Sequence, residues 1–199
     1  QFMKIKQYCL FVFLLLLLVS CKEDYTPKPS GYFLMDLPKH EYEKYENDVC
    51  PCTFEIPKYA EIQREEHFFD EKPEHPCWLN INFPYFNATI YLSYKDVSTR
   101  AQFEKVISDS YKMTFKHSQK ADFIDESSIE IPQNHVYGYQ FDIGGDAASS
   151  SQFFITDSLN HYIRGALYFK SKPNVDSVRP ALEFLKEDMD HMIQTFKWK

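Results

Sequence analysis

The sequence predicts an α+β fold in which one antiparallel sheet is packed with helices. Residues 79–83 and 88–94 alternate apolar and polar side chains, which is the period of half-buried strands. Three more strand patterns between residues 137 and 169 follow one another through short links, which force antiparallel pairing. Residues 178–196 carry apolar side chains at helical spacing, so a helix can cover the sheet.

The first half of the domain supplies strands and one helix. Residues 53–56 form a short strand pattern, and residues 84–87 turn the chain between the two alternating runs, which predicts a hairpin. A helix follows, with Ser98 as its N-cap and apolar side chains at helical spacing to about His117.

The second half predicts three strands, at residues 137–143, 152–156 and 163–169, and then the final helix. Asp176 or Ser177 would cap this helix, and Pro180 is tolerated in its first turn. This order of elements resembles the α/β/α sandwich of the PsbP and Mog1 type, a likeness of fold that implies no function.

The N-terminus predicts a lipoprotein signal peptide over residues 1–20. Lys4 and Lys6 precede an apolar run that is shorter than the ~20 residues a bilayer-spanning helix needs. The box Leu18-Val19-Ser20-Cys21 matches a site where a peptidase cuts after Ser20 and a diacylglycerol modifies the Cys21 thiol. Two or more acyl chains at Cys21 would anchor the mature protein stably to a membrane.

Residues 21–49 predict a tether, because three prolines break any helix and charged residues alternate with tyrosines. The aromatic side chains of this segment indicate that part of it packs on the domain. Residues 50–199 predict a single globular α+β domain.

The charge of the chain argues against a nucleic-acid partner. Loss of residues 1–20 would leave 20 Lys and Arg against 29 Asp and Glu, a net charge of −9. A polyanion would be repelled, and no basic cluster with interleaved aromatic residues opposes this total.

Three cysteines remain besides Cys21. An oxidising compartment permits a disulfide of Cys77 with either Cys50 or Cys52, whereas Cys50 and Cys52 are too close in sequence to pair in relaxed geometry. Zinc binding by all three would need a fourth ligand such as His75, and no second CxxC or paired His supports it. We expect neither a metal nor a cofactor.

A run of small residues links two aromatic strands, and it contains Gly144, Gly145, Asp146, Ala147, Ala148, Ser149, Ser150 and Ser151. It lacks the following helix and lysine of a phosphate loop, and its hydroxyls lack a nucleophile elbow. We expect a flexible hairpin loop with no catalytic residue. Because its small side chains leave the backbone accessible, it is also a candidate partner-binding loop.

Two other groups of polar residues are candidate binding sites. An acidic stretch predicts a solvated loop rather than a cation site, and its residues are Glu65, Glu66, His67, Asp70, Glu71, Glu74 and His75. Trp78, Asn80 and Asn82 lie on one face of a strand and could stack on and hydrogen-bond a sugar, although such a row is more often covered.

Long collinear stretches carry a family resemblance, and they are CKEDYTPKPSGYF from Cys21, CTFEIPKYA from Cys52, CWLNINFP from Cys77, ATIYLSYK from Ala88, VYGYQFDIGGDAASSSQFFITDS from Val136, HYIRGALYF from His161 and the terminal TFKWK. Over these stretches the chain resembles the gliding-motility lipoprotein family GldD of Bacteroidota.

The resemblance implies an envelope lipoprotein required for gliding and for the type IX secretion system, with no enzymatic activity. It implies a disulfide between Cys50 and Cys77, with Cys52 as an extra thiol. It also suggests GldE, which resembles an inner-membrane transporter, as a partner, so both the inner and the outer membrane stay open. Asp157-Ser158-Leu159 matches the O-glycosylation sequon of Bacteroidota, and the second match, at Ser177, competes with the helix cap.

Two hypotheses for function follow. In the first, the protein is a lipid-anchored assembly or scaffold factor that works through protein–protein contacts. In the second, it is an envelope glycan-binding or other ligand-binding module, or an enzyme, that uses the Trp78 strand face or the acidic loop.

Overall fold

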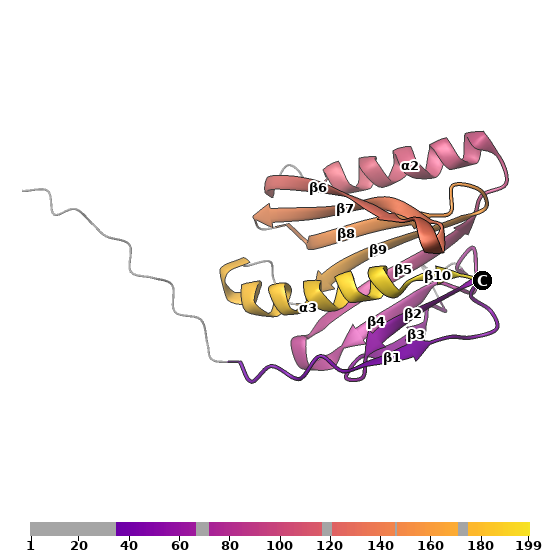
Figure 1. Ribbon diagram of the computed structural model, residues 1–199. Coiled ribbons are helices and arrows are strands. Elements are labelled where there is room, and N and C mark those ends of the chain that lie inside the picture. The colour runs from indigo at the N-terminus through magenta and orange to yellow at the C-terminus, as the bar shows by residue number, and fades with distance from the viewer. Residues whose placement is uncertain (1–34, 67–71, 117–120, 146, 171–174) are drawn as a thin grey trace, which may run out of the picture. The chain divides into compact units, whose positions relative to one another are not determined.

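The computed structural model describes residues 35–66, 72–116, 121–145, 147–170 and 175–199 (Figure 1). Its largest element is a seven-stranded sheet with the order β3-β4-β5-β9-β8-β7-β6, and every pairing in it is antiparallel. The strands are β3 (Glu61–Arg64), β4 (Leu79–Phe83), β5 (Ala88–Asp96), β6 (Ala121–Ile131), β7 (Val136–Gly145), β8 (Ser149–Thr156) and β9 (His161–Phe169).

Helix α2 (Arg100–Phe115) covers one face of this sheet over strands β6 to β9 (Figure 1). Its apolar side chains recur at helical spacing and pack on a small cluster of aromatic residues from β7, β8 and β9. The cluster is centred on Phe141, Phe154 and Tyr162, which are all buried.

The opposite face is covered by helix α3 (Val175–Thr195) and by a second, three-stranded sheet. That sheet has the order β1-β2-β10 and consists of β1 (Tyr42–Tyr45), β2 (Cys52–Pro57) and β10 (Lys197–Trp198). Leu185 and Met189 of α3 are fully buried in the main core, and burial of each such side chain contributes about 1.5–3 kcal/mol. The predicted α+β class is confirmed.

Four strands of the structure were not predicted from the sequence, namely β1, β3, β6 and β10. They are short, or they lie at the edge of a sheet and expose both faces, so they lack the alternation that marks a half-buried strand. Because β1 pairs with β2, the packed part of the chain begins before residue 50, within the range predicted as a tether.

The helix starts also differ from the predictions. Thr99, not Ser98, caps α2, and its hydroxyl accepts a hydrogen bond from the Gln102 N–H at 3.2 Å. Helix α3 begins at Val175, so Asp176 and Ser177 lie inside it, and Pro180 lies beyond its first turn. The side chains of residues 175–177 are outside the described part of the structure.

Gly138 lets β7 approach β8 closely. A Cβ atom at this position would lie 1.9 Å from the backbone oxygen of Phe154, which cannot move away as a side chain could. We expect Gly138→Ala to lower the free energy of unfolding by about 1–3 kcal/mol in urea denaturation. The exposed substitution Ser127→Ala, on the neighbouring strand, is the control and should change it by less than about 0.5 kcal/mol. A Gly138→Ala protein as stable as the wild type would contradict the close approach.

Candidate functional site: attachment of the N-terminal segment

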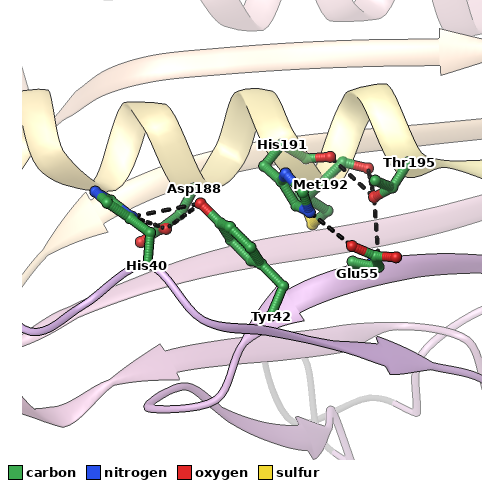
Figure 2. Close-up of polar contacts among 7 residues, drawn as sticks. All are labelled: His40, Tyr42, Glu55, Asp188, His191, Met192 and Thr195. Atoms are coloured by element: carbon green, nitrogen blue, oxygen red, sulfur yellow. Dashed lines mark hydrogen bonds and ion pairs between the residues drawn. The ribbon is translucent and has the colours of Figure 1, made fainter.

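A buried carboxylate on α3 holds the segment through which the chain enters the domain. Asp188 is only 1% exposed. One of its oxygens accepts hydrogen bonds from His40 Nδ1 at 2.7 Å and from the Tyr42 hydroxyl at 3.0 Å, and the other accepts one from the Tyr59 hydroxyl. Figure 2 shows His40 and Tyr42 reaching Asp188 from this segment. Three donors therefore compensate the cost of burying the carboxylate.

The two phenols are permanent donors to Asp188. Burial, and then the hydrogen bond to the carboxylate, raise the pKa of Tyr42 and of Tyr59 well above the usual tyrosine range. Both hydroxyls stay protonated at physiological pH. His40 also lies 3.2 Å from a Glu187 oxygen through Nε2, so its ring bridges two carboxylates of one helix.

The same side of α3 makes a second set of contacts one to two turns further on (Figure 2). His191 Nε2 lies 2.7 Å from a Glu55 oxygen, and the His191 ring stacks on Tyr42 with centroids 3.6 Å apart. The Thr195 hydroxyl accepts a hydrogen bond from the Glu55 N–H at 3.0 Å. Positions 188, 191 and 195 share one helix face, so α3 binds the N-terminal segment and β2 together.

This arrangement, which we call the Asp188 attachment, is suited to fixing the N-terminal segment on α3 rather than to catalysis. Each carboxylate oxygen accepts at least one hydrogen bond, and the donors among the described residues are an imidazole and two phenols that stay protonated. Among the described residues, no group of three or more His, Cys, Asp or Glu side chains could hold a metal ion. No helix in the same described part is long and apolar enough to cross a membrane.

The candidate partner-binding loop does not have the predicted form. Gly144 and Gly145 end β7, and Ser149, Ser150 and Ser151 begin β8, where all three are buried. Ser149 donates to the Leu167 carbonyl at 2.9 Å, and Ser151 donates to Asp142 at 3.1 Å. These serines therefore cannot form an exposed contact loop, and Asp146 lies outside the described residues.

The Trp78 face is half-buried and bonded within the protein. Trp78 Nε1 donates to the Tyr94 carbonyl at 2.9 Å, and Asn80 donates to Glu65 at 2.7 Å. Asn82 accepts from the Thr89 hydroxyl at 2.9 Å. The polar groups of Trp78, Asn80 and Asn82 therefore hydrogen-bond within the protein, in place of the bonds that a sugar would make.

The predicted acidic loop is described only at its two ends, because residues 67–71 are outside the described part. There, Lys95 Nζ lies 2.8 Å from a Glu74 oxygen, and His75 Nδ1 accepts the Cys77 N–H at 3.0 Å. Both contacts are made by residues of the connection that leads into β4.

The structure has a disulfide between Cys50 and Cys77, the pair that the family resemblance implied. Two of the three sulfurs are bonded to each other, so the three cysteines cannot form a zinc site. Cys52 is free and fully buried, and burial raises the pKa of its thiol to about 12. It is therefore a neutral, unreactive core residue.

Ser158 lies in the exposed turn between β8 and β9, with a positive φ of 66°. Asp157 shapes this turn, since one of its oxygens accepts the N–H groups of Leu159, Asn160 and His161, each at 2.9 Å. Burial alone would raise the pKa of Asp157, but these backbone donors together hold it below the usual value.

The Asp157 turn makes stability depend on pH. Because the folded pKa of Asp157 lies below the unfolded value of about 3.9, the ionised carboxylate stabilises the fold fully above that value. This contribution declines as pH falls below about 3.9 and is lost as pH falls through the folded pKa. The loss of unfolding free energy caused by Asp157→Asn should therefore be smaller at pH 3 than at pH 7 in urea denaturation. Asp48→Asn, at an exposed position, is the control. A loss that is equal at both pH values would contradict the role of these donors.

A cleft of about 440 Å³ lies beside this turn, where the C-terminus meets the β8–β9 connection, and sequence patterns did not indicate it. Trp198 stacks on His161 with centroids 5.1 Å apart and donates to the His135 carbonyl at 3.2 Å. Other residues that line it are Gln133, Asn134, Asp157, Leu159, Lys197 and Lys199.

The fold defines the class of protein first: an α/β/α sandwich of the PsbP type. The solution structure of cyanobacterial PsbP (CyanoP) from Synechocystis sp. PCC 6803 is similar, with a TM-score of 0.50 and 8% identity, over 84% of this chain and 98% of that one. At this identity the likeness concerns the fold alone. No curated protein matches the sequence.

The family follows from a comparison of the sequence with known protein families. Residues 22–198 match the family described as gliding motility lipoprotein GldD, and the chain belongs to that family. Membership implies a role in gliding motility and a membrane-anchored place in the cell envelope.

Proposed function

We propose that this lipoprotein is an assembly or scaffold factor of the gliding machinery and of the type IX secretion system, acting through protein–protein contacts. The Asp188 attachment carries the proposal. The segment that leads from Cys21 is bound to α3 by hydrogen bonds to the buried Asp188 carboxylate, so a lipid on Cys21 would hold the body of the domain near the membrane. The tether would then be no longer than residues 21–39, after a signal peptide at residues 1–20.

In this proposal the domain faces the periplasm, and its partners are other proteins of the machinery, GldE among them. A rigid body on a short tether raises the local concentration of its contact surfaces at one membrane, which favours weak contacts there.

A deletion strain tests the proposal. We expect it to lose colony spreading and type IX secretion, and to regain both with the wild-type gene. Cys21→Ser should leave the domain folded but release it from the membrane fraction, and it should fail to restore spreading. The matched cysteine variant Cys52→Ala keeps the lipidated residue and should restore both. A deletion strain that spreads and secretes normally would refute the proposal.

The cleft at Trp198 favours a second candidate, a ligand-binding module of the envelope. The variant Leu159→Ala removes a 73% exposed side chain from its rim. If the protein is a scaffold that does not use this cleft, Leu159→Ala should restore spreading as well as the wild type does. Loss of spreading with unchanged protein level would favour ligand binding.

A further inference from the structure

The two edges of the seven-stranded sheet differ in length and in openness. At one edge, β3 has only four residues. At the other edge, β6 has eleven residues and lies at the border of the sheet (Figure 1). A long edge strand presents a row of backbone N–H and C=O groups to any strand that comes beside it, whereas short edge strands limit such pairing.

Strand β6 is open to solvent over most of its length. Side chains at seven of its eleven positions are exposed, so α2 does not bury it. Helix α2 reaches β6 at two places, where Tyr111 donates to Glu126 at 2.6 Å and where Ile124 packs on the small cluster. Within the described part of the chain, β7 is the one backbone partner of β6.

The charges on β6 select the kind of strand that can pair with it. The strand carries Asp122, Asp125, Glu126 and Glu130, and it carries no Lys, Arg or Pro. Pairing with a second copy would set acids beside acids, which is destabilising. A strand with Lys or Arg at the facing positions would be attracted instead.

The two faces of β6 favour different side chains on a strand that pairs with it. Glu126 lies on the α2 face, and the alternation of a strand places Glu130 there too. On the other face, Phe123 is 53% exposed and lies against Gly144, and the regular register with β7 places Asp125 on this face too. The complementary strand therefore has basic residues on the α2 face, opposite Glu126 and Glu130, and an aliphatic residue beside Phe123 on the other face.

We propose that β6 is a docking edge, at which an extended segment of a partner protein with alternating basic and aliphatic residues adds an eighth strand to the sheet. This inference rests on the proposed scaffold function and names the kind of partner. Backbone hydrogen bonds along β6 would supply affinity, and the acids would select the partner and exclude self-pairing.

The test uses an eleven-residue peptide of alternating Lys and Val with the detergent-solubilised protein purified from its membrane. Binding should slow hydrogen exchange of the β6 amides selectively. The same peptide with every backbone nitrogen methylated, and a peptide of alternating Glu and Val, should each bind at least tenfold more weakly. Equal binding of the methylated peptide, or slowed exchange at another element, would overturn the proposal.

Charge reversal supplies the matched variants. Glu130→Lys, on the α2 face, should weaken peptide binding about tenfold, whereas Glu183→Lys changes the net charge equally at an exposed site elsewhere and should not. A wild-type protein that dimerises through β6 would overturn the proposal. So would normal spreading of cells that carry the β6 variant. The scaffold function itself is tested by the deletion strain and would survive that result.

Discussion

Replacing Asp188 by alanine is expected to lower the free energy of unfolding by about 3–5 kcal/mol, because it removes three hydrogen bonds to a buried, charged acceptor. His40, Tyr42 and Tyr59 all converge on this carboxylate. Denaturation in urea measures the loss. Hydrogen exchange should also show that the β1 amides open first, since their segment is bound through Asp188.

The controls for Asp188 come from the same helix. Glu183→Ala removes an exposed carboxylate of α3 and should change stability by less than about 0.5 kcal/mol. Asp188→Asn keeps the size of the side chain and one acceptor oxygen, so its loss should be intermediate. If Asp188→Ala were as stable as Glu183→Ala, the N-terminal segment would not be held by this carboxylate, and the proposed short tether would lose its support.

Removal of the disulfide should have an effect of similar size. Cys50 and Cys77 are 27 residues apart, and a crosslink that closes a loop of this length stabilises a protein by about 3–4 kcal/mol in the chain-entropy model. The double variant Cys50→Ala with Cys77→Ala should lose that amount in urea denaturation. Reduction of the wild type with dithiothreitol should produce the same loss.

Cys52 provides the control for this measurement. The Cys52→Ala protein keeps the disulfide and should still lose stability on reduction, whereas the double variant should be insensitive to dithiothreitol. Because the Cys52 thiol is buried and its pKa is raised to about 12, it should not replace either partner by exchange. A double variant that is as stable as the oxidised wild type would contradict a stabilising disulfide.

Sequence patterns located the elements whose two faces differ. Strands β4, β5 and β7 alternate buried with less buried side chains, which the sequence alternation predicts, and the spacing of Leu185, Met189 and Met192 indicates α3. The sequence of β6 shows no clear apolar–polar alternation, because this edge strand exposes most of its side chains on both faces. The small polar residues Ser149 to Ser151 predict a loop, but they begin β8, where the hydroxyls of Ser149 and Ser151 bond to neighbouring strands.

The sequence by itself determined the α+β class, the order of the main strands and helices, and the family, because local periodicity and long collinear stretches are properties of the chain alone. The Asp188 attachment and the open β6 edge were decided only by the tertiary structure. His40 and Asp188 are 148 residues apart, and no local pattern indicates that a histidine will meet a particular carboxylate. Likewise, a strand becomes an edge only when the order of all seven strands is established, because its missing neighbour is a property of the whole sheet.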